Sequence, residues 1–194
     1  ADEDFFKLMK HLNKPVEVLK GRAFDYTGYE VTTYTVDGSN AIFSYPNKLI
    51  GGCAISTIPE GTKSIARGAF SDVKGLKSVE IPSSVIAIDA DAFTNCVDLT
   101  TIHVDESNTV YDSREGCNAI IETVSNKLIV GTKETVIPAS VTSIGFNAFS
   151  VNTNADIVVP ANITSIDRGA FINANNLYFE SEIPTEITGD IFGR

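Results

Sequence analysis

The chain has 194 residues, of which 43% are hydrophobic and 21% are charged, a composition typical of a globular protein and too apolar for disorder. Its 25 acidic and 15 basic residues give a net charge of −10. This charge argues against nucleic-acid binding and against docking on anionic lipid, because both depend on Lys and Arg. No stretch reaches the roughly 18 consecutive apolar residues of a spanning helix. We expect no nucleic-acid partner and no direct membrane insertion of this segment.

The three cysteines, Cys53, Cys96 and Cys117, are an odd number and lack the CxxC spacing of metal sites. One disulfide with one free thiol is an open alternative, but we expect no bridge. Cys96 is expected to pack as a small apolar residue, and Cys117 to be exposed. Residues 1–4 are acidic where an export signal would be basic, so either there is no signal or it was removed before this segment.

The first element expected in chain order is a short helix that Asp2 or Asp4 can cap and that ends near Pro15. One side of this helix carries four apolar residues: Phe5, Phe6, Met9 and Leu12. A membrane anchor so short and acidic is unfavourable, so we interpret the helix as a cap on the fold. Residues 31–36 have the β-branched and aromatic side chains of a strand.

Two similar segments then predict β-hairpins. Residues 40–42 and 47–50 (Asn-Ala-Ile and Asn-Lys-Leu-Ile) flank a short turn, and residues 118–120 and 126–129 repeat the same letters around another turn. The offset between the two copies is about 79 residues. Gly52, which follows the first hairpin, is interpreted as part of a turn.

The strongest pattern is a repeat of about 23 residues that is marked by Ile-Pro or Val-Pro. Its prolines are Pro59, Pro82, Pro138, Pro160 and Pro184. The first four are followed eleven residues later by an Ala-Phe pair ending in Phe70, Phe93, Phe149 and Phe171. About five core residues per unit would contribute roughly 10 kcal/mol, less than the cost of ordering about 23 backbones, so stacked units must share one core.

The pattern L-x-x-I-x-I-P-x-x-V-x-x-I-x-x-x-A-F-x-x-C, clearest over residues 76–96 and 136–149, resembles the BspA-like leucine-rich repeats of bacterial surface proteins. Residues 111–123 also resemble an insertion of that family. The resemblance spans roughly residues 40–192. It implies a curved, β-rich leucine-rich-repeat solenoid with a short strand per repeat and little helix. It also implies a non-enzymatic protein, outside the cell or on its surface, that adheres to or binds extracellular proteins of a host or partner cell.

These patterns divide residues 1–194 of a single domain into five parts. We expect an N-terminal cap region at 1–39, a hairpin at 40–52, repeats at 53–104, an insertion with a hairpin at 105–136, and repeats with the C-terminal end at 137–194. The last repeat is irregular, because Phe192 comes three residues early relative to Pro184.

The expected binding surface is the outward side of the repeat strands, at positions two and four residues before each proline. The candidate ligand-binding residues are Thr57, Ser78, Glu80, Thr101, His103, Glu134, Asp156, Glu180 and Glu182. This row is polar and increasingly acidic, with no evident apolar or aromatic cluster. Two alternatives are a structural spacer within a larger surface protein, and a glycan-binding module that uses exposed aromatic residues: Tyr26, Tyr29, Tyr34 and Tyr45.

No residue pattern predicts a catalytic site, a metal site or a cofactor. His103 is interpreted as a solvated strand residue, and Asp89 and Asp91 as turn residues rather than a catalytic carboxylate pair. The sequence also lacks glycine-rich phosphate loops and hydrolase motifs. An acidic loop could provide oxygen ligands for Ca²⁺, but its spacing is not that of an EF-hand, so a solvated loop is favoured. Its acidic residues are Asp105, Glu106, Asp112 and Glu115.

Overall fold

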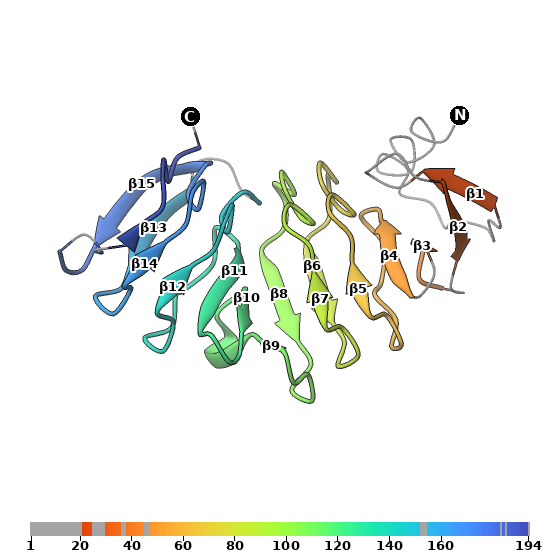
Figure 1. Ribbon diagram of the computed structural model, residues 1–194, viewed down its shortest axis with the longest axis horizontal. Coiled ribbons are helices and arrows are strands. Elements are labelled where there is room, and N and C mark those ends of the chain that lie inside the picture. Colours follow the sequence, from red (N-terminus) through yellow and green to blue (C-terminus); the bar gives the residue numbers. More distant parts are fainter. Residues whose placement is uncertain are drawn as a thin grey trace.

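The computed structural model describes residues 21–24, 30–35, 38–44, 47–151, 155–182, 184 and 186–193. Short strands follow one another in successive coils along an arc (Figure 1). Within the described ranges the single helical element is a 3-10 turn, η1 (Arg114–Gly116). The prediction of a β-rich solenoid with little helix is therefore confirmed. The cap helix expected before Pro15 lies outside the described residues.

Two six-stranded sheets share one plan, in which antiparallel strands come first and two-residue parallel strands follow. The first sheet contains, in spatial order, β1 (Gly21–Phe24), β2 (Glu30–Thr35), β3 (Ile42–Ser44), β4 (Lys48–Gly51), β5 (Ser64–Ile65) and β7 (Ala87–Ile88). The second contains β9 (Tyr111–Asp112), β10 (Ala119–Glu122), β11 (Lys127–Gly131), β12 (Ser143–Ile144), β14 (Ser165–Ile166) and β16 (Glu186–Ile187). The strand predicted at residues 31–36 is confirmed as β2 over its described part.

The antiparallel pairs β3–β4 and β10–β11 occupy the two segments in which the sequence predicts hairpins. In each pair the second strand also starts a parallel ladder, since β4 pairs with β5 and β11 with β12. Lys48 faces Ser64 across the first ladder, and Lys127 faces Ser143 across the second. Both halves of the chain therefore repeat the same backbone arrangement at the offset of about 79 residues seen in the sequence.

The four remaining strands form two further parallel pairs. One pair is β6 (Ser78–Ile81) with β8 (Thr101–Val104), and the other is β13 (Ala155–Val159) with β15 (Ala174–Phe179). In β6 the side chains of Val79 and Ile81 are buried and those of Ser78 and Glu80 are exposed, as the alternation predicts. These pairs define the strand face, the surface on which most of the candidate binding residues lie.

The Ala-Phe turns line up in a column at another side of the coils. Phe70 N donates to Ala92 O (2.8 Å), and Phe149 N donates to Ala170 O (2.8 Å). The rings stack in two pairs, Phe70 on Phe93 (centroids 5.3 Å apart) and Phe149 on Phe171 (5.4 Å). All four rings and the alanines before them are buried, which confirms their predicted place in the core.

Gly52 and its counterpart Gly131 are not merely turn residues, so that interpretation is wrong. A Cβ atom at Gly52 would lie 2.1 Å from Phe70 Cε1, and one at Gly131 would lie 2.5 Å from Phe149 Cε1. Neither glycine has a positive φ, so the lack of a side chain is required by packing rather than by backbone conformation. Each glycine makes room for the aromatic ring of the adjacent coil.

Candidate binding face

The nine candidate residues are all exposed, but the structure divides them between strands and loops. Ser78 and Glu80 on β6 lie beside Thr101 and His103 on β8, in the register Ser78–Thr101 and Glu80–His103. His103 Nδ1 lies 2.7 Å from Glu80 Oε2, and both side chains are largely solvated. This part of the strand face is therefore polar, as predicted.

Thr57 and Glu134 do not lie on strands, which corrects their expected placement. Thr57 directly follows a tight turn in which Cys53 N donates to Ser56 Oγ (2.7 Å). Glu134 lies within the corresponding turn, in which Thr132 N donates to Thr135 Oγ1 (2.7 Å). These turns occupy the strand position of the coil. The expected continuous row is consequently split into the pairs β6–β8 and β13–β15.

Glu180 and Glu182 were expected beside Asp156 and Val158, and that register is wrong. The structure pairs Asp156 with Asn176 and Val158 with Tyr178, and β15 ends at Phe179. The cause is that Leu177 and Phe179 turn toward the core, whereas Pro184 comes four residues later than the coil requires. Counting back from Pro184 therefore placed the two glutamates on a strand that has already ended.

The corrected register shows an apolar row, Val158 beside Tyr178, where the sequence indicated no apolar cluster. Val158 (52% exposed) lies directly beside Tyr178 (53% exposed), and Val136, two residues before its proline like Val158, is 75% exposed. The spacing before Pro138 and Pro160 predicts that the two valines point outward, and their exposure confirms it. Tyr178 could not be identified in this way, because its position depends on the cross-strand pairing.

Four carboxylates lie within four residues of these exposed apolar side chains along the chain: Glu134, Asp156, Glu180 and Glu182. Asp156 Oδ1 accepts hydrogen bonds from Asn175 Nδ2 (3.0 Å) and Asn176 Nδ2 (2.9 Å). In the part of the chain that the structure describes, no Lys or Arg forms an ion pair with any of the four. The arrangement joins exposed apolar area to uncompensated negative charge, which suits contact with a basic surface.

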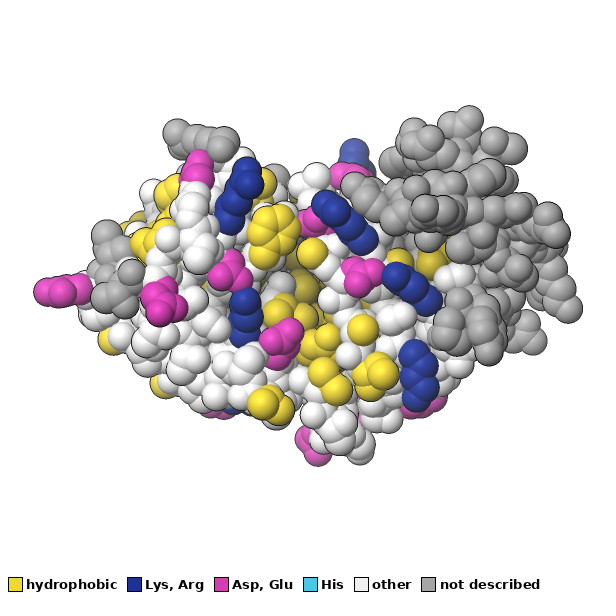
Figure 2. Space-filling model, in the orientation of Figure 1, with side chains coloured by type: hydrophobic (Ala, Val, Ile, Leu, Met, Phe, Trp, Pro, Cys, Tyr) yellow, Lys and Arg dark blue, Asp and Glu magenta, His cyan; other side chains and the backbone are white. Residues whose placement is uncertain are grey.

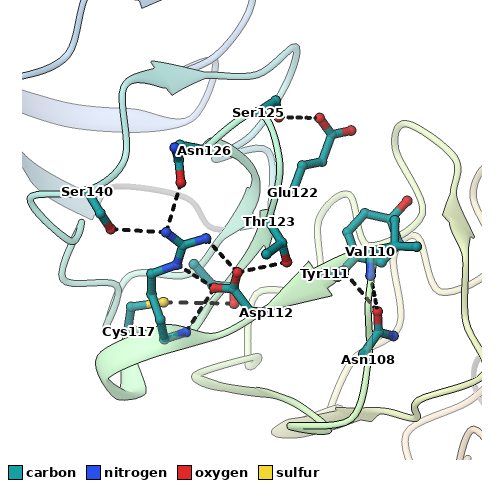
Figure 3. A network of polar contacts seen from close by, with 12 residues as sticks. Asn108, Val110, Tyr111, Asp112, Cys117, Glu122, Thr123, Ser125, Asn126 and Ser140 are labelled. Carbon is teal, nitrogen blue, oxygen red and sulfur yellow. Dashed lines mark hydrogen bonds and ion pairs between the residues drawn. The ribbon is translucent and has the colours of Figure 1, made fainter.

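The acidic loop considered for calcium is instead held by a polar network within the insertion (Figure 3). Arg114 Nε donates to Asp112 Oδ1 (2.7 Å), and Thr123 Oγ1 donates to Asp112 Oδ2 (2.9 Å). Burial alone would raise the pKa of Asp112, but these hydrogen bonds outweigh it and lower the pKa. Among the described residues no three His, Cys, Asp or Glu side chains group as metal ligands.

The same network connects η1 to the second hairpin. Arg114 Nη1 donates to Asn126 Oδ1 (2.8 Å) and to Ser140 Oγ (3.2 Å). On the other side of the insertion, Asn108 Oδ1 accepts from Val110 N and Tyr111 N (2.9 Å each). The network therefore fixes the backbone of the insertion, and its polar groups have structural partners.

Asp89 and Asp91 each form an ion pair with a different cation. Lys48 Nζ lies 2.9 Å from Asp89 Oδ2, and Arg67 Nη2 lies 2.9 Å from Asp91 Oδ2. Asn147 Nδ2 also donates to Asp91 Oδ1 (2.7 Å). The two carboxylates tie adjacent coils together at the turns.

The three cysteines are free and buried. Cys96 Sγ donates to Phe70 O (2.9 Å), as expected for a packed residue of the repeat. The expectation that Cys117 is exposed is wrong, since the turn of η1 directs it into the core beside Ala119 and Ile121. Burial raises the pKa of the Cys117 thiol.

Comparison with protein families decides the class of this solenoid. The family model described as the BspA type leucine-rich repeat region matches in six copies, over residues 52–177 and 122–192. The chain belongs to the BspA-type leucine-rich repeat family. The resemblance deduced from the Ile-Pro and Ala-Phe spacing is thereby confirmed. No curated protein matches the chain.

Solved structures of three bacterial proteins are similar to this BspA-type chain. The pneumococcal vaccine antigen PcpA matches with a TM-score of 0.50 and 16% identity over 71% of this chain and 36% of its own. A leucine-rich repeat protein from Eubacterium ventriosum has a TM-score of 0.47 and 18% identity, covering 70% and 45%. A leucine-rich cell surface protein from Faecalibacterium prausnitzii has a TM-score of 0.45 and 24% identity, covering 68% of this chain and 41% of its own. The chain thus spans less than half the length of each, and the likeness concerns the fold alone.

Proposed function

We propose that this chain is one leucine-rich-repeat domain that acts as a non-enzymatic protein-interaction module outside a bacterial cell or on its surface. The family assignment supports a repeat scaffold without a cofactor of its own. The observation that carries the proposal is the exposed row of Val158 and Tyr178 on the strand face. Exposed apolar residues in register on a rigid parallel pair are typical of a recognition surface.

The chemistry of the row defines what it binds. Tyr178 supplies a large, partly apolar contact that loses little rotamer entropy, and Val158 beside it extends the contact. The neighbouring glutamates attract a partner with basic residues around an apolar patch. We propose extracellular proteins of a host or partner cell as the partners, and adhesion as the outcome.

A binding assay on immobilised, purified extracellular proteins of a host tests this proposal. The double variant Val158→Thr/Tyr178→Thr removes the apolar row. It places threonine, a residue with high strand propensity, at both positions. We expect at least about a tenfold loss of affinity for bound partners, equal to 1.4 kcal/mol. Val124→Thr, which changes a 93% exposed valine in the hairpin turn, is the matched control and should leave affinity unchanged.

The same assay separates the alternatives. Binding by the double variant as strong as by the unchanged chain would contradict a role for this row. A glycan array that gives strong signals, lost in Tyr178→Thr, would favour the glycan-binding alternative. Of the tyrosines first considered for glycans, Tyr26, Tyr29 and Tyr45 lie outside the described residues, whereas Tyr34 lies on β2.

A further inference from the structure

A groove of about 230 Å³ lies between the two halves of the solenoid, at the place where the insertion interrupts the ladder of two-residue strands. The first sheet ends at β7, and no described strand pairs with its second edge. Ile88 N donates to the side-chain hydroxyl of Tyr111 (3.1 Å) instead of to another strand. Figure 2 shows the hollow near the centre of this face, with hydrophobic side chains in it and charged side chains around it.

The two halves remain joined beside the groove, so it has a rigid wall. Asn95 N donates to Ser150 O (3.0 Å), and Asn147 Nδ2 donates to Asp91 Oδ1 (2.7 Å). The column of Ala-Phe turns thus continues across the insertion although the strand ladder does not. The groove is therefore open to solvent on one side and closed on the other by hydrogen bonds between the two halves.

The groove contains an aromatic side chain where other repeats have none. Phe146 lines it and is 47% exposed. The equivalent positions, two residues after the isoleucine of each short strand, are occupied by Arg67, Ala90 and Arg168. Ile129 and Val130 supply further apolar surface. An exposed ring at a position that elsewhere carries Arg or Ala has no packing reason and offers a face to a ligand.

The charge of the groove is negative. Four carboxylates line it, those of Asp89, Asp91, Glu122 and Asp167, against one lysine, Lys127. Three of the four have a cationic partner in the structure. The carboxylate of Glu122 accepts only the hydroxyl of Ser125 (2.7 Å) among the described residues.

The charges of two of these carboxylates also act on Tyr111, whose hydroxyl binds the groove residue Ile88. Burial raises the pKa of Tyr111 despite the bond that its oxygen accepts from Ile88, and the charges of Glu122 and Asp89 raise it further.

We propose that this groove binds an arginine side chain of an extended partner polypeptide. The aliphatic stem would lie on Ile129 and Val130, and the guanidinium would face the ring of Phe146 and the carboxylate of Glu122. A planar guanidinium suits this pair better than an ammonium, because it stacks on aromatic rings and binds a carboxylate with two hydrogen bonds. An extended segment fits because β7, which borders the groove, pairs with no described strand on its outer side. The site is separate from the strand face.

Titration of the ¹⁵N-labelled chain with the tripeptide acetyl-leucyl-arginyl-leucinamide tests the proposal. We expect amide shifts confined to residues 88–91, 122, 127–130 and 145–148. The same tripeptide with citrulline, which keeps the shape but not the charge, should bind at least about tenfold more weakly. Phe146→Arg should abolish binding, and Glu122→Gln should weaken it by about tenfold. Because Arg occupies the equivalent position in two other repeats, we expect Phe146→Arg to fold normally.

Several outcomes would overturn the assignment. Equal affinity for the citrulline tripeptide would exclude charge recognition, and unchanged binding by Phe146→Arg would exclude this groove. Tighter binding of spermidine than of the arginine tripeptide would replace a polypeptide partner by a small polyamine. The absence of any shift in the groove at millimolar peptide would also contradict the proposal. Val124→Thr, in the exposed hairpin turn, serves as the control that keeps the arginine affinity.

Discussion

The two halves of the solenoid have nearly the same backbone bonds but different surfaces. Ala66 N donates to Leu49 O (2.8 Å) in the first half, and Gly145 N donates to Leu128 O (2.8 Å) in the second. The ion pair Lys48–Asp89 likewise has its counterpart in Lys127–Asp167. The repeat therefore reproduces bonding as well as shape, including bonds formed by surface side chains.

The halves differ at exposed side chains that take no part in the shared bonds. Arg67 in the first half pairs with Asp91, whereas Phe146 at the equivalent position of the second half is exposed in the groove. The framework positions, such as Phe70 and Phe149, are the same residue because each must fill the same space. The comparison indicates that recognition should be sought where equivalent positions disagree.

The largest expected effect tests whether the two aromatic stacks are equivalent. Phe93→Ala and Phe149→Ala should each lower the free energy of unfolding by about 3–5 kcal/mol, because a buried ring leaves a cavity in the core. Urea unfolding of both variants measures this. A shift near zero in either variant would show that its ring is not a core residue.

The next effect concerns Gly52 and Gly131, which lie against the rings of Phe70 and Phe149. Gly52→Ala and Gly131→Ala should destabilise the chain by about 1–3 kcal/mol, since the new methyl group overlaps a phenylalanine ring. Gly52→Ala should cost more, because its Cβ contact of 2.1 Å is shorter than the 2.5 Å at Gly131. Thermal unfolding of the two variants compares them. If either variant were as stable as the unchanged chain, the packing role of that glycine would be wrong.

A smaller effect is the pH dependence of stability that Asp112 gives to the insertion. The pKa of Asp112 is lowered in the folded chain, so its bonds with Arg114 add stability above the ordinary pKa near 3.8. That stability disappears as the pH falls through the lowered pKa. Asp112→Asn should therefore cost about 1–2 kcal/mol at pH 7 and progressively less as the pH falls below 3.8, by chemical denaturation. A difference that stayed constant with pH would assign the loss to packing instead of charge.

The smallest effect compares the two lysine bridges. Lys48→Met and Lys127→Met should each cost less than about 1 kcal/mol, because exposed ion pairs contribute little. Lys127→Met should cost more than Lys48→Met, since the Lys127–Asp167 ion pair is less exposed than the Lys48–Asp89 ion pair. Measuring both variants at 0.05 M and 1 M NaCl should show the difference from the unchanged chain shrink in salt. A salt-independent cost would point to the packing of the lysine stem.

Much of the fold could be predicted because the repeat is local. The inward positions Val79, Ile81 and Phe93 follow from alternation and from the eleven-residue interval after proline. Glu180 and Glu182 were misplaced because the register of β15 depends on the burial of Leu177, which is a contact between coils and not a spacing in the chain.

The missed features share the same physical cause. Cys117 is buried because the chain turns at η1, and Gly52 is required by a ring eighteen residues later in sequence. The groove forms only because the insertion removes one strand from a ladder while the turn column continues. Such features depend on contacts between coils, so a repeat pattern read along one chain does not reveal them.

Amide hydrogen exchange at equivalent positions tests the central claim, that one bonding framework is built twice, most directly. The amides of Gly52 and Gly131 donate to Ala69 O (2.9 Å) and Ala148 O (2.8 Å), and those of Phe70 and Phe149 donate to the next coil. We predict protection factors within about tenfold of each other for each pair, as expected for equal local stability. Strong protection in one half with free exchange in the other would contradict the account.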